Sequence, residues 1–157
     1  IKMSFIPFKI VLVDPQIPQN TGNIARLCSC TASELYIVGN PGFRMTDKYL
    51  KRAGLDYWND LNVKQYRSIE DLQSQFSENS FYFLSTKAQK TYTEANFKQG
   101  DFFVFGSETK GLSSEIIENN KDKLLKIPMV TNKRSLNLSN SVSIVLYEAI
   151  RQTKILE

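Results

Sequence analysis

Phe105-Gly-Ser-Glu-Thr-Lys-Gly-Leu112 directly follows an apolar run that begins at Asp101. A second stretch of the same kind, Arg134-Ser-Leu-Asn-Leu-Ser-Asn-Ser-Val142, follows the apolar run Leu124 to Met129. Both runs have the length and composition of buried strands, and both stretches are dense in glycine, hydroxyl and amide groups. A strand that ends in such residues exposes backbone N–H and C=O groups at the edge of an open sheet, where ligands bind. The two stretches therefore predict an α/β sheet with a ligand crevice.

The rest of the chain alternates strand and helix signals. Apolar runs predict strands at Phe8 to Val13, Leu35 to Val38, Val63 to Tyr66, Ser80 to Leu84, Asp101 to Phe105 and Leu124 to Ile127. Caps and breakers predict helices from Asn20 or Thr21 to Thr31, from Thr46 to Ala53, from the cap Ser68 to Phe76, from Ser114 to Asn119 and from Ser139 to Lys154. This alternation predicts one α/β domain over residues 1–157, with a mainly parallel sheet covered by helices on both faces.

The last predicted helix is apolar over more than one face. One stripe at helical spacing contains Val142, Val145, Leu146, Ala149 and Ile150. Ile144 and Tyr147 lie off that stripe. The helix is therefore either simply well buried or carries a subunit interface on its second face.

The composition of the chain excludes several kinds of catalytic and metal site. The chain has 157 residues, a formal net charge of +4 and a pI near 9.0, which favours an anionic partner only weakly. It contains no histidine, which excludes Ser-His-Asp and Cys-His catalysis and histidine-ligated zinc. Cys28 and Cys30 are expected on different faces of a helix as reduced, buried thiols, so no metal is expected. No apolar run reaches the roughly 18 residues of a membrane span, and the cytoplasm is the expected compartment.

Three polar loops follow predicted strands and are expected to meet at one crevice. In the first, Asp14 to Arg26, the helix N-terminus could receive an anion; alternatively Asn20 only caps the helix and Arg26 is a solvated surface residue. The second has the glycine spacing of a phosphate-binding P-loop, but Leu112 stands where that loop needs lysine, so a ligand without a polyphosphate fits better. In the third, Arg134 to Ser141, Ser139 is the expected helix cap, and Asn137 and Asn140 exceed what capping requires.

These loops resemble a known family. Asn20-x-Gly22-Asn23-x-x-Arg26, Phe105 to Leu112, and Ile127-Pro-Met with Arg134 to Val142 are similar in order and spacing to the three motifs of the SPOUT RNA methyltransferases. Lys51-Arg-Ala-Gly-Leu-Asp-Tyr57 resembles the small single-domain subgroup that methylates the wobble nucleotide of tRNA. The likeness spans residues 8 to 153. Ser107 replaces a proline that is common in the second motif.

The resemblance implies a C-terminal trefoil knot, a homodimer and the cofactor S-adenosyl-L-methionine. It implies methyl transfer to the ribose 2'-OH of cytidine or uridine 34 in the anticodon stem-loop of tRNA, with tRNA-Leu as the expected substrate. Carried over by motif, the catalytic candidates are Arg26, Arg134 and Asn140, and the cofactor-binding candidates are Leu84, Gly106, Ile127 and Ser135. The substrate-binding candidates are Asn20, Asn23, Lys51, Arg52 and Ser139.

Two alternatives to this function stay open at this point. One keeps the reaction but moves it to another tRNA position or to rRNA. The other is an RNA-binding protein without catalysis, against which Arg26 and the intact third motif argue. For Arg26 itself we expect stabilisation of a developing alkoxide rather than proton abstraction, because a guanidinium rarely loses its proton in a protein.

Overall fold

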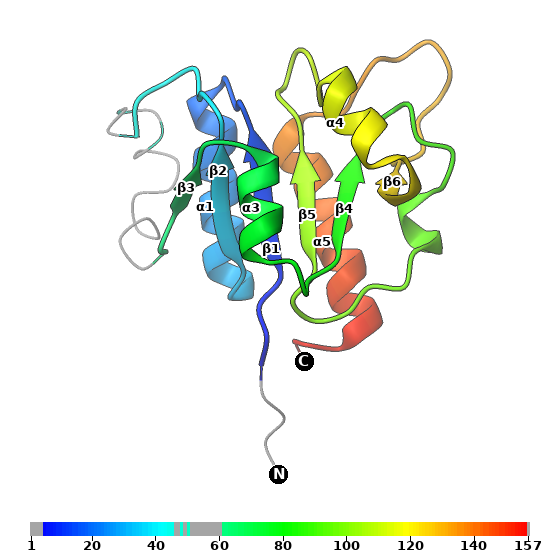
Figure 1. The fold of residues 1–157 in the computed structure, drawn as a ribbon, viewed down its shortest axis with the longest axis horizontal. Helices are drawn as coiled ribbons and strands as arrows, with labels where there is room; N and C mark the ends of the chain where they lie inside the picture. The colour runs from blue at the N-terminus through cyan, green and yellow to red at the C-terminus, as the bar shows by residue number, and fades with distance from the viewer. Residues whose placement is uncertain (1–4, 46–47, 49, 51–60, 157) are drawn as a thin grey trace.

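The computed structural model describes residues 5–45, 48, 50 and 61–156. Within these residues six strands form one sheet in the order β3-β2-β1-β5-β4-β6, and every ladder between them is parallel (Figure 1). The predicted α/β fold with a parallel sheet is confirmed. The predicted helix Thr46 to Ala53 lies almost wholly outside the described residues.

The strands lie close to their predicted positions. They are β1 (Lys9–Val13), β2 (Glu34–Val38), β3 (Lys64–Tyr66), β4 (Phe81–Leu84), β5 (Phe102–Phe105) and β6 (Leu124–Leu125). The central strands β1 and β5 are buried at every position, as expected for apolar runs in a parallel sheet covered on both faces. β6 is shorter than predicted, because the ladder to β4 covers only Leu124 and Leu125.

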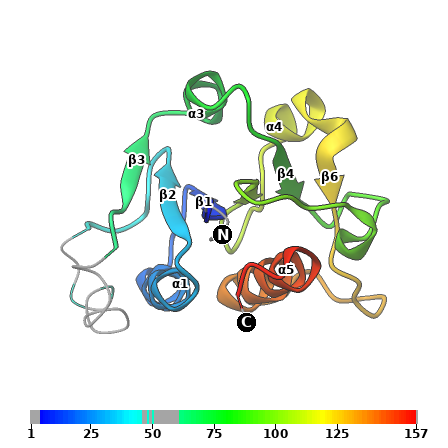
Figure 2. The ribbon, with the colours of Figure 1, turned by 90° about the horizontal axis from the view of Figure 1, so that it is seen from below.

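Helices cover both faces of this sheet. α1 (Pro18–Thr31) and α5 (Leu138–Thr153) lie side by side on one face, and α3 (Ile69–Gln75) and α4 (Ser114–Asn119) lie over the other (Figure 2). Two short 3₁₀ turns, η1 (Tyr92–Glu94) and η2 (Lys121–Lys123), complete the connections. Because alternate strand side chains point to opposite faces, the apolar core divides into one cluster under each helix layer.

Two predicted helix starts are wrong. α1 begins at Pro18 with Ile17 as its cap, and no side chain caps it there, so neither Asn20 nor Thr21 is the cap. Proline suits the first helical position because its missing N–H has no partner there in any case. Arg26 therefore lies eight residues beyond Pro18, more than two turns into the helix. In α5 the cap is Asn137, whose side chain accepts a hydrogen bond from the Asn140 amide at 3.2 Å, and not Ser139.

The predicted apolar stripe of α5 is confirmed, since Val142, Val145, Leu146, Ala149 and Ile150 are all buried. The second face behaves differently. Ile144 is only half-buried, and Tyr147 keeps 50% of its surface exposed. This second face of α5 is not covered by the described part of the chain.

The two cysteines lie on different faces of α1, as predicted. Cys28 is buried, and burial raises the pKa of its thiol above the ordinary value. Cys30 is exposed, so the expectation that both thiols are buried is wrong for this residue. Among the described helices, none combines the length and the apolar character that a membrane crossing requires.

A carboxylate lies buried at the start of β5. Asp101 is 4% exposed, and its Oδ2 accepts a hydrogen bond from the Lys98 amide at 2.8 Å. Burial raises the pKa of Asp101 to about 6, and this outweighs the opposing effects of the Lys98 amide bond and the nearby lysines. Because the folded carboxyl binds its proton more tightly than the unfolded one, the folded state loses stability as the pH rises through about 6.

We therefore predict that Asp101→Asn removes this loss. An asparagine oxygen can accept the same amide bond without carrying charge. Relative to the unsubstituted chain, the free energy of unfolding of the variant should rise by on the order of 1 kcal/mol between pH 4 and pH 7.5. Urea unfolding at both values measures it, with the exposed Asp122→Asn as control. An equal difference at both pH values would contradict the prediction.

Candidate functional site

A pocket of about 460 Å³ opens beyond the carboxyl ends of β4, β5 and β6. Three segments line most of it: residues 84–87 after β4, residues 105–112 after β5, and residues between 127 and 141 that lead into α5. These ends lie at the top of the sheet in Figure 1. In an open parallel sheet this is the edge where ligands bind.

The segment after β5 folds back on itself in a tight turn. The Gly111 amide donates to the Ser107 carbonyl at 3.0 Å, and the Lys110 amide donates to Ser107 Oγ at 3.1 Å. Gly111 has a φ of +67°, and a Cβ at Gly106 would lie 2.1 Å from the Gly111 carbonyl carbon. Glycine at both positions is therefore required by the backbone. Ser107, where the family often has proline, contributes its hydroxyl to closing the turn.

This turn is not a phosphate-binding P-loop. Leu112, at the position of the P-loop lysine, is 7% exposed and forms part of the pocket wall. The loop therefore offers an apolar surface where a triphosphate would need a cation.

The four predicted cofactor-binding residues are brought together in this pocket. Leu84 and Ile127 are half-buried and offer apolar walls. Gly106 offers backbone, and Ser135 is an exposed hydroxyl on the third loop. Arg134, predicted as catalytic, also lines the pocket. The second and third predicted loops thus share one cavity, whereas the first predicted loop, Asp14 to Arg26, contributes no residue to its lining.

One carboxylate connects the pocket to the first loop. Glu108 lines the pocket, and its two oxygens accept hydrogen bonds from the backbone amides of Gln16 and Ile17, both at 2.9 Å. Its Oε2 also accepts from Asn20 Nδ2 at 3.2 Å. Both amides belong to the segment just before Pro18, the first residue of α1. Glu108 thus fixes the entry to α1, where no local side chain caps the helix.

Asn20 continues this connection to the third loop. Its Oδ1 accepts a hydrogen bond from Asn137 Nδ2 at 3.2 Å, and Asn137 in turn caps α5. Asn20 is 7% exposed, so both ends of its amide are used inside the protein. We call Glu108, Asn20 and Asn137 the polar bridge. It joins the three motif loops, and it gives Asn20 an internal role rather than the predicted contact with substrate.

Other predicted residues lie away from the pocket lining. Asn23 and Arg26 are exposed on α1. Asn140 is exposed in the first turn of α5, and the Ser139 hydroxyl donates to Asn137 Oδ1 at 2.7 Å. Lys51 and Arg52, predicted to bind substrate, lie outside the described residues.

A further loop completes the lining. Ser85, Thr86 and Lys87 follow β4 and form one wall, as their position directly after a predicted strand suggests for a loop at the same end of the sheet. Lys110 and Ser141 add polar groups from the second and third loops, although sequence reasoning assigned neither of them a particular role. Within the described residues, no three His, Cys, Asp or Glu side chains are grouped as a metal site would need.

The polar bridge generates a prediction. Glu108→Gln keeps the shape of the side chain but places an amide donor against a backbone N–H donor. We expect a loss of about 1–3 kcal/mol in the free energy of unfolding and faster hydrogen exchange at the Gln16 and Ile17 amides. Glu115→Gln, an exposed carboxylate on α4, is the control and should change neither quantity. Unchanged exchange at these two amides in Glu108→Gln would refute the role of Glu108 in fixing the entry to α1.

Comparison with solved structures identifies the class of protein that this fold and pocket define. A solved structure described as "Structural insights into the 2-OH methylation of C/U34 on tRNA" matches with a TM-score of 0.88 and 36% identity. The match covers 94% of this chain and 96% of that one. The fold is therefore that of RNA ribose methyltransferases.

The sequence comparisons are more specific. The model of the SpoU rRNA Methylase family matches residues 7–147, and the chain belongs to this family. It is 44% identical over 146 residues to the tRNA (cytidine(34)-2'-O)-methyltransferase of Saccharophagus degradans, covering 92% of this chain and 95% of the relative. The enzyme of the same name from Methylovorus glucosotrophus matches with the same identity and coverage.

Proposed function

We propose that this protein transfers a methyl group from S-adenosyl-L-methionine to the ribose 2'-OH of nucleotide 34, cytidine or uridine, of tRNA. The observation that carries the proposal is the pocket lined by the second and third motif loops, to which the polar bridge ties the first motif loop through Asn20. The 44% identity to relatives named for this reaction, over nearly their whole length, supports the choice of substrate position. tRNA-Leu is the substrate that we propose among the tRNAs.

The pocket suits the proposed cofactor. Its volume of about 460 Å³ is within the range of small-molecule sites, and Leu84, Ile127 and Leu112 give it apolar walls that fit an adenine. Loop amides and carbonyls near Gly106 and the hydroxyl of Ser135 can hold the polar groups. The cofactor would supply the methyl group on a sulfonium, and it carries no phosphate that Glu108 would repel.

The chain's own residues would prepare the ribose hydroxyl. A 2'-OH becomes a good nucleophile only as its proton leaves, so a nearby cation that stabilises the developing alkoxide accelerates transfer. We assign this role to Arg26, whose guanidinium stays charged. Arg134, at the pocket itself, would position the ribose or a neighbouring phosphate, and Asn140 would assist it.

We propose that the protein acts as a homodimer through the layer formed by α1 and α5. The half-buried Ile144 and the exposed Tyr147 lie on the outer face of α5, and Arg26 is exposed on the neighbouring helix. Arg26 is absent from the pocket lining of its own chain, so association through this layer offers a route by which it reaches a pocket, that of the partner. An aromatic side chain beside aliphatic ones is a typical centre for such an interface.

We also propose the C-terminal trefoil knot. β6 pairs with β4 although β5 follows β4 in the chain, so the segment after β6 must return past the loops of the pocket before α5 begins. That return path supports a threaded chain, which is rare among protein folds. The single domain over residues 1–157 and the cytoplasm remain part of the same proposal.

The central test is to map the methylated nucleotide after reaction with unmodified total tRNA. We expect a 2'-O-methyl group at position 34 in tRNA-Leu. Arg26→Ala should lower the transfer rate by about 10²–10³, the usual cost of losing one such electrostatic group, without changing cofactor affinity measured by calorimetry. Methylation at another position or in rRNA would replace the proposed substrate, and no cofactor binding would leave an RNA-binding protein.

The dimer generates a separate prediction. Tyr147→Glu places a charge on the proposed interface and should convert the dimer to a monomer in sedimentation equilibrium. The monomer should still bind the cofactor, because Tyr147 lies outside the pocket lining, but it should lose methyl transfer. Arg151→Ala, further along α5 and bonded to Glu148 at 2.8 Å, is the control for a general effect on the helix. A Tyr147→Glu chain that stays dimeric rules out this interface.

A further inference from the structure

The mouth of the pocket carries one cation on each of its three loops. Lys87 follows β4, Lys110 lies in the turn after β5, and Arg134 lies in the loop before α5. All three side chains line the pocket and are exposed. Within the described part of the chain, none of them forms an ion pair.

Glu108, the carboxylate that lines the same pocket, is turned away from these cations. Both of its oxygens are taken by the amides of Gln16 and Ile17 and by the side chain of Asn20. The polar bridge therefore holds the negative charge toward α1. Lys87 and Lys110 therefore keep their hydrogen-bond donors available to an anionic ligand.

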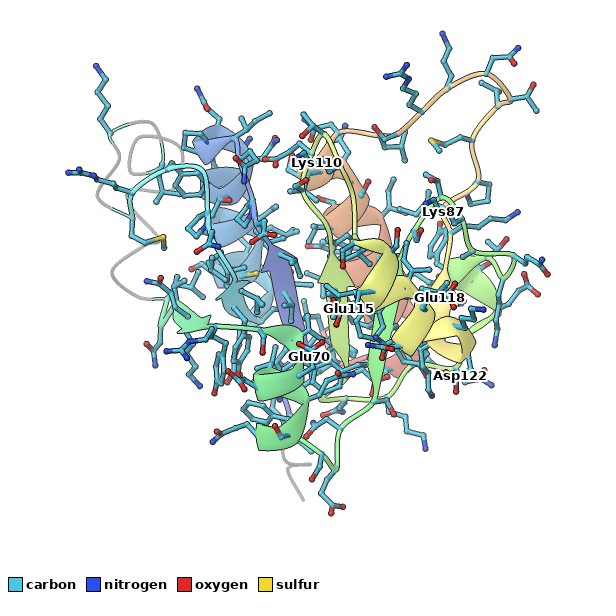
Figure 3. The ribbon with its side chains drawn as sticks, turned by 45° about the horizontal axis from the view of Figure 1, so that its top comes forward. Glu70, Lys87, Lys110, Glu115, Glu118 and Asp122 are labelled. Carbon is cyan, nitrogen blue, oxygen red and sulfur yellow. The ribbon has the colours of Figure 1, made fainter. Side chains whose placement is uncertain are left out.

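Acidic side chains gather on the neighbouring flank instead. Glu115 and Glu118 lie on α4 and Asp122 on η2, and Glu118 pairs with Lys121 at 2.9 Å. Figure 3 shows Lys87 and Lys110 on separate loops in the upper part of the view, with Glu115, Glu118 and Asp122 below them. Lys87, Lys110 and Arg134 thus line the pocket, whereas these three carboxylates do not, and their flank also carries Lys121 and Lys123.

We propose that Lys87 and Lys110 bind phosphates of the RNA strand on the two sides of the nucleotide whose ribose enters the pocket. This inference rests on the proposed function and deepens it, since it states from which side the RNA arrives. A single strand carries a phosphate on both sides of every nucleotide, and cations on separate loops around one opening match that arrangement. The flank formed by α4 and η2 carries charges of both signs and offers the strand no comparable set of free cations.

The test is the double variant Lys87→Gln/Lys110→Gln, with kinetics on tRNA and filter binding at several salt concentrations. We expect the KM for tRNA to rise about tenfold and kcat to stay within twofold. The slope of log affinity against log salt concentration should become shallower by about 0.7 for each phosphate that the variant no longer binds. Calorimetry on the same variant measures cofactor affinity: a tenfold loss would assign these lysines to the carboxylate of S-adenosyl-L-methionine and would overturn the inference.

Lys121→Gln is the matched control. It removes an equally exposed lysine, but from the acidic flank, and should leave the KM and the salt slope unchanged. Thermal unfolding of each variant checks that the fold is kept. An unaltered KM and salt slope in the double variant would overturn the inference, as would an equal loss of RNA binding in Lys121→Gln. If the unsubstituted protein does not methylate tRNA, the proposed function itself is wrong, which is a different outcome.

Discussion

The hydrogen bonds accepted by the Glu108 carboxylate are the interaction on which the site depends. They reach across from the loop after β5 to the start of α1, and through Asn20 to the cap of α5. Each loop alone is a short polar segment with little apolar surface to hold it in place. Because charged acceptors form hydrogen bonds that are stronger than neutral ones, one part-buried network can fix three loops relative to each other. The shape of the pocket therefore depends both on this hydrogen-bond network and on the edge of the sheet.

This network also explains how a chain without histidine or metal-ligand clusters among its described residues can be built for group transfer. The groups that the chain offers at its pocket are backbone amides and carbonyls, hydroxyls and cations at the edge of the sheet. The tight turn from Gly106 to Gly111 brings its own backbone close to the cavity, and Leu112 closes the wall. In such a site, the bound donor supplies the reactive group. The protein positions the reactants and provides the electrostatic environment of the reaction.

Much of the fold was predictable because its signals are local. Apolar runs such as that of β1 and the capping serine of α3 are read from neighbouring residues, and both were found where predicted. The start of α1 was not predicted, because no local side chain caps this helix and the Glu108 carboxylate that fixes its entry lies about 90 residues away in sequence. The hydrogen-bond partners of Asn20 are similarly far away in sequence, so its role inside the protein could not be predicted. Motif matching therefore assigned Asn20 to substrate binding. The pocket residues Leu84, Gly106, Ile127 and Ser135 were found because motif order carries long-range information that periodicity lacks.

The hydrogen bond between Asn20 and Asn137 joins positions 117 residues apart. During synthesis on the ribosome, α1 therefore emerges well over 100 residues before its partner in this bond. Since α5 covers the same face of the sheet as α1, part of that face stays open until α5 has been made. The pocket is likewise completed only when α5 docks, because Leu138 and Ser141 of this helix belong to its lining.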